Sequence, residues 1–234
     1  MQEFSKSLKL MGNNFTITVV DGCALKAEKN IDAAVEEIKR IERLLTTYSD
    51  DSQTSLINRN AGIIPVKVDP EVLQLIERSK NISHITQGAF DISYGSIDKS
   101  LWNFDRDMEA LPSVETARKM VHLIDYRNIV LDAENQTVFL KNSGMRIGFG
   151  GIGKGYAAEK AKALLQSRGV AAGIINASGD LTAWGVQQSG KPWRIGISSP
   201  DNPGHIFSYL EISERAVATS GNYEKFVMIG GKKY

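Results

Sequence analysis

Two hydrophobic periodicities alternate along the chain, one typical of strands and the other typical of helices. Residues 14–20 read NFTITVV, and the apolar Phe15, Ile17 and Val19 alternate with polar residues, which predicts a strand. Residues 24–45 repeat apolar side chains at helical spacing between charged ones, which predicts a long amphipathic helix. Its apolar stripe consists of Ile31, Ala34, Val35, Ile38, Ile41 and Leu45.

Further helices are predicted by the same spacing and by the residues at their ends. One begins near Pro70, because the fixed φ of proline suits the first helical turn. Another runs from Ser113, a candidate N-cap, to Ile124, and a third covers about residues 155–168 and is closed by Gly169. The side chains expected to face inward are Val72, Leu73 and Ile76 in the first helix and Ala117, Met120, Val121 and Ile124 in the second.

Strand-like segments are interspersed with these helices. Residues 128–141 predict a hairpin whose strands are joined across Asp132–Asn135, and the polar residues 46–62 predict a loop with a short helical turn at Ser55–Asn58. Further strands are expected at residues 171–177, 192–198, 207–213, 215–221 and 224–229. Hairpin-like returns among the helices favour an α+β or mixed α/β fold, with mixed sheets flanked by helices, over a regular βαβ series.

Composition narrows the class of protein. The chain has 234 residues, enough for one large domain or two small ones, and 42% of them are hydrophobic, as in ordinary soluble globular proteins. A net charge of +1, with charges interspersed along the chain, argues against a nucleic-acid partner. A single cysteine, Cys23, excludes an internal disulfide, and His84, His122 and His205 are too scattered to predict a metal cluster.

The stretch IGFGGIGKGYAAEK, residues 147–160, has the G-x-G-x-x-G spacing of a dinucleotide-binding loop. A strand-like segment before it and a helix after it favour that interpretation, but the carboxylate expected about 20 residues further on is missing. A Walker-type loop is disfavoured because Gly155, and not Ser or Thr, follows Lys154. A glycine-rich turn needed only for close packing is the structural alternative. In either case the N–H groups at the helix start, with Lys154, suit an anion.

Other polar stretches leave two interpretations open. Asp91 lies between apolar neighbours in GAFDISYGS, where it either binds a partner or cation or caps a backbone turn. Residues 176–185, NASGDLTAWG, form either a binding turn or an ordinary tight turn, and Thr219–Ser220–Gly221 either donates to phosphate or ends a strand. Tyr48, in the polar loop, is a candidate for stacking on a flat ligand.

Taken in order, these segments resemble the ApbE family, the FAD:protein FMN transferases. The resemblance extends from about Leu10 to the last residue. The matching segments are LMGNNFTI, IERLLTTYSDDSQTSLIN, GAFDISYG, LWNFD, IGFGGIGKGYAAEKAKALL, NASGDLTAWG, PWRIGI and AVATSGNYEKF. The resemblance implies one ApbE-like domain over residues 1–234, with FAD and Mg²⁺ bound. It also implies transfer of FMN from FAD to a threonine or serine hydroxyl of a target flavoprotein, leaving AMP.

The resemblance also implies roles for particular residues. Met11 and Tyr48 would border the flavin, with Tyr48 as the stacking candidate, while Ala89, Phe90 and Asp91 would line the FAD site.

On the other side of the implied site, Gly150 and Lys154 in the glycine loop would lie near the pyrophosphate and metal. Gly151 would contribute its carbonyl oxygen to Mg²⁺, and Thr219 and Ser220 would approach the cofactor.

Two departures from the family pattern matter. Many members have an acid where this chain has Gly148. The chain also ends at Tyr234, before the segment in which the family has its presumed catalytic histidine and its acidic and threonine metal ligands. We therefore expect a chain truncated at the C-terminus, with no catalytic residue of its own and inactive by itself.

Alternative functions remain open on the sequence. The first is an FAD-binding module without transferase activity, and the second, disfavoured by the missing carboxylate, is an NAD(P) oxidoreductase. Family members are commonly exported and lipid-anchored, so the resemblance implies a periplasmic or extracytoplasmic protein. It also implies membrane tethering through an anchor that this chain lacks.

Overall fold

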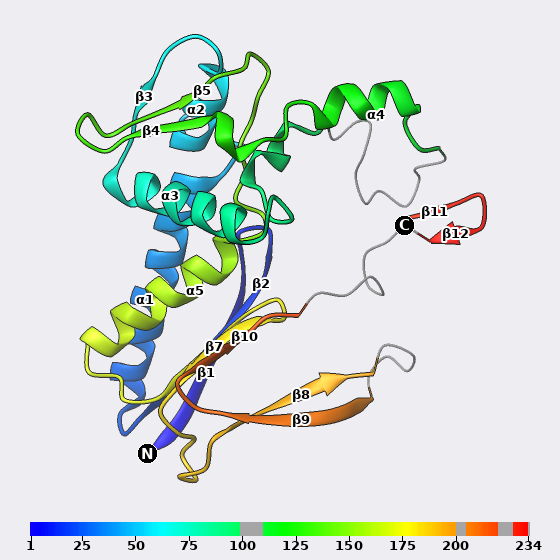
Figure 1. The fold of residues 1–234 in the computed structure, drawn as a ribbon. Coiled ribbons are helices and arrows are strands. Elements are labelled where there is room, and N and C mark those ends of the chain that lie inside the picture. The colour runs from blue at the N-terminus through cyan, green and yellow to red at the C-terminus, as the bar shows by residue number, and fades with distance from the viewer. Residues whose placement is uncertain (99–109, 200–204, 220–226, 234) are drawn as a thin grey trace. The chain divides into compact units, whose positions relative to one another are not determined.

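The computed structural model describes residues 1–98, 110–199, 205–219 and 227–233 (Figure 1). The chain forms two compact units, each built from separate stretches of sequence. Unit 1 consists of Met1–Glu42 and Gly153–Tyr223, and unit 2 consists of Arg43–Ile152 and Glu224–Tyr234. The mixture of helices and antiparallel sheets confirms the predicted α+β class. The expectation of a single domain over the whole chain stays a prediction.

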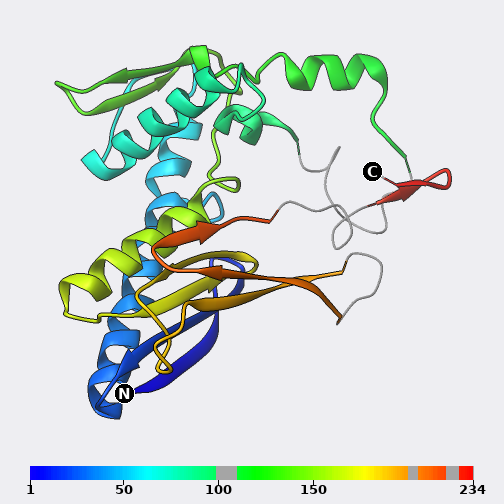
Figure 2. The same cartoon turned by 60° about the horizontal axis from the view of Figure 1, so that its bottom comes forward.

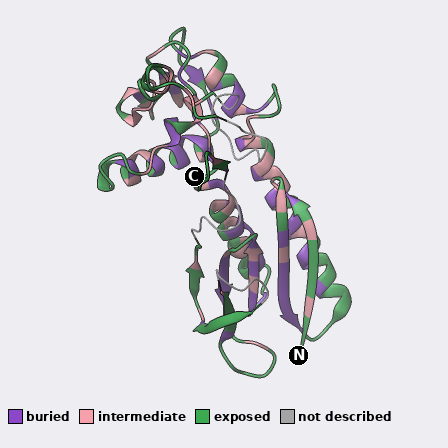
Figure 3. Cartoon of the chain, turned by 90° about the vertical axis from the view of Figure 1, so that its right-hand side faces the viewer, coloured by how far each residue is buried: buried purple, intermediate pink, exposed green. Residues whose placement is uncertain are grey.

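Unit 1 is built on a five-stranded sheet in the order β1-β2-β6-β7-β10. These strands are β1 (Gln2–Leu10), β2 (Asn13–Asp21), β6 (Gly173–Ala177), β7 (Asp180–Trp184) and β10 (Arg215–Val217). Each neighbouring pair is antiparallel. The dinucleotide-binding interpretation is therefore wrong for this fold, because that loop belongs to a parallel βαβ unit. Figure 3 shows the edge strand β1 largely exposed and its neighbour β2 largely buried.

Helices cover one face of this sheet. They are α1 (Ala24–Leu45), of which the part up to Glu42 belongs to unit 1, and α5 (Gly153–Ser167). Phe15, Ile17 and Val19 of β2 point to this face and are fully buried, and the six residues of the predicted α1 stripe are buried as well. The predicted bounds of α1 are confirmed, and α5 begins two residues before its predicted start.

A separate hairpin packs its base against the other face of the sheet (Figure 2). It pairs β8 (Trp193–Ser198) with β9 (Ile206–Ile212), and its base packs Trp193 and Ile212 against Val20, Leu181 and Ala183. The indole N–H of Trp193 donates to the carbonyl of Trp184 at 3.0 Å, which satisfies its buried polar atom.

Unit 2 combines short helices with a three-stranded antiparallel sheet in the order β3-β5-β4. Its elements are α2 (Gln53–Arg59), β3 (Val66–Lys67), α3 (Pro70–Ile85), the 3-10 helix η1 (Ile92–Ser96), α4 (Val114–Val121), the 3-10 helix η2 (Tyr126–Asn128), β4 (Ile129–Asp132), β5 (Thr137–Leu140), β11 (Met228–Ile229) and β12 (Lys232–Lys233). The predicted helical turn, the Pro70 helix and the 128–141 hairpin are confirmed. No helix among the described residues is long and apolar enough to cross a membrane.

Some sequence predictions were wrong or incomplete. None of the described residues of α4 is buried, and Val121, predicted to face inward, is 54% exposed. Helical periodicity identifies the apolar face of a helix, but it does not show whether another element packs against that face. The last strand before the glycine stretch is β5, which ends at Leu140, and residues 141–149 form no strand. β1 was missed because its exposed side is polar, although Phe4, Leu8 and Leu10 keep the alternation of a strand.

Candidate functional site

The first half of the glycine stretch is clamped within unit 2. Asn58, on α2, holds Ile147 through two hydrogen bonds: its Nδ2 donates to the Ile147 carbonyl at 3.0 Å, and its Oδ1 accepts the Ile147 N–H at 2.8 Å. The Gly148 N–H donates to the carbonyl of Ile92 at 2.9 Å. The N–H of Arg146 donates to Ser96 Oγ at 2.9 Å, and that hydroxyl lies 3.0 Å from the Arg146 carbonyl. Contacts with α2 and η1 thus fix the backbone of residues 146–148, which leads into the glycine loop.

This clamp requires a glycine at position 95. A Cβ at Gly95 would lie 2.7 Å from the carbonyl carbon of Ile147 and 2.9 Å from the Gly148 nitrogen, and real side chains do not come so close. Gly148 differs, because a Cβ there would meet only Gly95 Cα, at an ordinary 3.8 Å. The backbone at Gly148 therefore leaves room for a Cβ atom, whereas the backbone at Gly95 does not.

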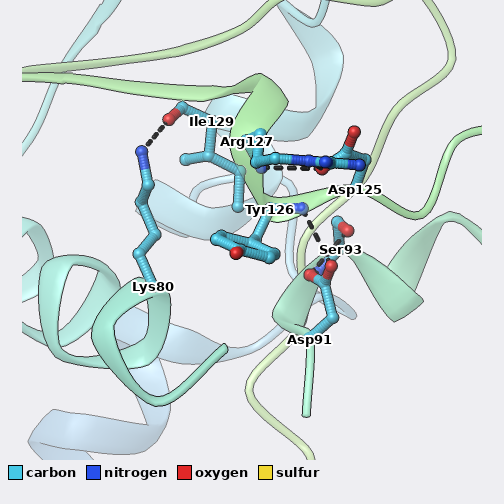
Figure 4. Close-up of polar contacts among 7 residues, drawn as sticks. All are labelled: Lys80, Asp91, Ser93, Asp125, Tyr126, Arg127 and Ile129. Atoms are coloured by element: carbon cyan, nitrogen blue, oxygen red, sulfur yellow. Dashed lines mark hydrogen bonds and ion pairs between the residues drawn. The ribbon is translucent and has the colours of Figure 1, made fainter. Parts of the chain in front are cut away.

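Asp91 is the N-cap of η1 (Figure 4). Of the two interpretations left open by the sequence, the structure thus shows the one in which Asp91 caps a backbone turn. Its Oδ1 accepts the N–H of Ser93 at 2.8 Å and the Ser93 hydroxyl at 2.7 Å, and its Oδ2 accepts the Tyr126 N–H at 2.8 Å. Both carboxylate oxygens are therefore engaged by the protein. The expectation that Asp91 lines an FAD site stays a prediction.

Charged side chains surround this cap (Figure 4). Hydrogen bonds from Arg127 lower the pKa of the Asp125 carboxyl below its usual value, since the guanidinium and the backbone N–H of Arg127 both stabilise its charged form. Lys80, on α3, donates to the carbonyl of Ile129. Burial lowers the pKa of the Lys80 ammonium, and the positive charge of Lys141 lowers it further.

The other predicted residues of unit 2 lie at its surface. The aromatic ring of Phe90 packs on Gly151, where an added Cβ would lie 3.3 Å from Phe90 Cε2. Ala89 and Gly150 are exposed, and Tyr48 is 86% exposed. Phe90 and Gly151 are thus brought together, whereas the flavin-stacking role of Tyr48 stays a prediction.

Residues from three stretches considered in the sequence analysis meet in unit 1: the glycine stretch, residues 176–185 and the segment that begins at Thr219. Lys154, in the first turn of α5, forms an ion pair with Asp180 of β7, with 3.5 Å between Nζ and Oδ2. Asp180 Oδ1 also accepts the N–H of Thr219, beyond the end of β10, at 3.4 Å. On the sequence alone, residues 176–185 are either a binding turn or an ordinary tight turn, with no role assigned to Asp180 itself. Its partners depend on strand pairing across the sheet. Ser220 lies outside the described residues.

Met11 occupies an unusual backbone conformation in the turn between β1 and β2. Its φ is 50° and that of Gly12 is 72°, so the two residues form a tight hairpin turn in which both have left-handed φ. Asn13 Nδ2 donates to the Met11 carbonyl at 3.0 Å. Asn and Gly tolerate this conformation better than methionine does, and the expected place of Met11 beside the flavin stays a prediction.

The comparisons with known proteins identify the family. The sequence profile described as the ApbE family matches residues 11–234. The chain belongs to the ApbE family. A curated ApbE relative from Klebsiella pneumoniae, named FAD:protein FMN transferase, is 32% identical over 198 residues, which cover 84% of this chain and 60% of the relative. Another of that name, from Treponema pallidum, is 27% identical over 100% of this chain and 68% of its own length.

Solved ApbE structures share the fold. The crystal structure of an ApbE protein from Thermotoga maritima matches 100% of this chain and 75% of its own chain, with a TM-score of 0.90 and 28% identity. The flavin transferase ApbE from Vibrio cholerae matches 95% of this chain with a TM-score of 0.84 and 22% identity, which supports the fold alone. This chain therefore spans between 60% and 75% of the lengths of three of these relatives.

The described residues include no group of three or more His, Cys, Asp or Glu side chains placed to hold a metal ion. Gly151 is exposed and offers only its backbone carbonyl. Mg²⁺ commonly keeps several waters and takes one or two carboxylates together with substrate phosphates. The role of Gly151 as a ligand of Mg²⁺ therefore stays a prediction.

Proposed function

We propose that this ApbE protein is an FAD:protein FMN transferase, moving FMN from FAD to a threonine or serine hydroxyl of a target flavoprotein. The observation that carries this proposal is the ApbE match over residues 11–234, together with curated relatives of that name. The extracytoplasmic location and the membrane tether stay predictions beside it.

The reaction balances as a substitution at phosphorus. The acceptor hydroxyl oxygen bonds to the phosphorus of the FMN half, and the bond from that phosphorus to the bridging oxygen breaks. The bridging oxygen leaves with AMP, and the hydroxyl proton passes to a base. We assign no described residue as that base, because His84, His122 and His205 lie outside the family motifs.

The glycine stretch supports the binding part of this proposal. The first N–H groups of a helix have no partners within it, and the first turn of α5 contains no acidic residue. Lys154, in that turn, adds a positive charge suited to phosphate oxygens. Phosphoryl-type transfer depends mainly on positioning and charge neutralisation, so these groups would act on the pyrophosphate of FAD.

FAD binding and AMP release together test the proposal. Titration of the chain with FAD, followed by flavin fluorescence, is expected to give saturable binding that weakens when Lys154→Ala removes the ammonium. Lys191→Ala, which removes an exposed lysine between β7 and β8, is the matched control and should bind like the wild type. The proposal includes a dependence on Mg²⁺. Repeating the titration with EDTA, which removes Mg²⁺, should therefore weaken FAD binding.

Two outcomes would contradict it. Absence of saturable FAD binding would remove the basis for any flavin transfer. Retention of FAD by the protein without AMP release, in the presence of Mg²⁺ and an acceptor, would instead indicate an FAD-binding module.

A further inference from the structure

Asp180 joins three segments that are far apart in the sequence. It receives the ammonium of Lys154 on one carboxylate oxygen and the backbone N–H of Thr219 on the other. All three residues belong to unit 1, so these contacts lie within one compact body. The carboxylate therefore lies at the junction of the α5 N-terminus, the turn before β7 and the end of β10.

The position of Asp180 is well determined by its backbone. The β6–β7 turn places Ser178 at φ 59° and Gly179 at φ 100°, and Asp180 pairs with Ala177 across it. Asn176 Oδ1 accepts the Gly179 N–H at 2.9 Å, which closes the turn. Lys154, by contrast, reaches its partner through a flexible four-carbon chain.

We propose that Asp180 is a positioning residue that orients Lys154 toward the pyrophosphate of FAD, an inference that rests on the proposed function. An ammonium has three donors, so one directed at Asp180 leaves two for phosphate oxygens. Protein kinases use the same arrangement, in which a glutamate holds the lysine that binds the nucleotide phosphates.

The bond to Thr219 extends this role to the end of β10. Asp180 Oδ1 accepts the Thr219 N–H at 3.4 Å, which is long for a hydrogen bond. One carboxylate thus contacts both the Lys154 ammonium and the backbone just beyond β10.

The ion pair contributes little to folding. Its side chains are 27% and 30% exposed, and pairs that water reaches in this way contribute little to stability. Its main effect is on orientation, because holding Lys154 in place before FAD arrives reduces the side-chain entropy lost on binding. The Asp180 carboxylate also competes with the phosphates of FAD for the Lys154 ammonium. If orientation dominates, removing the Asp180 charge weakens FAD binding. If competition dominates, removing it tightens FAD binding.

A double-mutant cycle tests the proposal. Asp180→Asn removes the charge but keeps an oxygen that accepts the Thr219 N–H. It is expected to weaken FAD binding roughly threefold, in line with the strength of such pairs. In a Lys154→Ala background, the same change should have no further effect. Riboflavin, which has no phosphates, should bind all these variants alike.

Asp32→Asn is the matched control, because it breaks the Lys6–Asp32 ion pair of unit 1 by the same chemical change. It should leave the FAD affinity unaltered. The inference would be overturned if Asp180→Asn bound FAD as tightly as the wild type or more tightly. It would also be overturned if Asp180→Asn lowered the FAD affinity by the same factor whether residue 154 is Lys or Ala. The proposed function would stand in each of these cases. A wild-type chain that does not bind FAD would contradict the proposed function itself.

Discussion

At the scale of single residues, the turn at Met11 combines backbone strain with a predicted place beside the flavin. Left-handed φ costs a residue with a Cβ roughly 1–2 kcal/mol, and Asn tolerates it better than Met. The Met11 φ of 50° therefore makes this position one where stability and function are expected to oppose each other.

We predict that Met11→Asn raises the free energy of unfolding by about 0.5–1 kcal/mol and weakens FAD binding. Urea unfolding and FAD titration measure the two effects. Gln136→Asn is the control, because Gln136 has a φ of 54° in the β4–β5 turn but no predicted role. It should gain stability and bind FAD normally. A Met11→Asn chain that binds FAD like the wild type would contradict a flavin contact.

Asp125 gives a prediction for the pH dependence of stability. Hydrogen bonds from Arg127 lower its pKa in the folded chain below its usual value. A lowered carboxyl pKa contributes stability that is present above the unfolded pKa, about 3.9, and is lost as the pH falls through the folded pKa.

Accordingly, Asp125→Asn should unfold with a shallower loss of stability below about pH 4 than the wild type. Denaturant unfolding at a series of pH values measures this slope. Asp50→Asn, which breaks the exposed Arg59–Asp50 pair by the same chemical change, serves as the comparison. Equal slopes for the wild type and Asp125→Asn would show that the Arg127 contact does not persist in solution.

At the scale of elements, η1 and α2 determine the path of the glycine stretch. The backbone at Gly95 leaves no room for a side chain beside Ile147, whereas Gly148 has ordinary space. Neither position has a left-handed φ, so the difference between them is purely one of contact.

The two alanine variants should therefore differ in stability. Gly95→Ala is expected to lower the free energy of unfolding by about 1–3 kcal/mol, since backbone atoms must move to admit the methyl group. Gly148→Ala should change it by less than about 0.5 kcal/mol. Thermal unfolding of both variants provides the measurement, and equal melting temperatures would contradict the clamp.

Element prediction from the sequence succeeded where periodicity is strong. The apolar stripe of α1 and the alternation in β2 come from local spacing alone, and both elements form as predicted. The Asp180 contacts with Lys154 and Thr219 were not predicted, because they require β6, β7 and β10 to pair across the sheet. The Tyr126 N–H that binds Asp91 is likewise 35 residues away in sequence.

At the scale of the whole molecule, function was predicted from the order of the motifs and not from any one of them. The glycine stretch alone mimics a dinucleotide-binding loop, and the antiparallel pairing of β6 excludes that interpretation. The ApbE match over residues 11–234 assigns the loop to a different fold. Unit 1 by itself holds the Lys154–Asp180 ion pair, and unit 2 by itself holds the contacts of Asn58 with Ile147.

The most direct test of the proposed function is the mass of an acceptor after reaction. The protein would be incubated with FAD, Mg²⁺ and a flavoprotein acceptor, and the acceptor analysed by intact mass spectrometry. We predict a gain of one FMN on a threonine or serine, with one AMP released per acceptor and no gain when that residue is replaced by alanine. An unmodified acceptor in the presence of bound FAD would contradict the account.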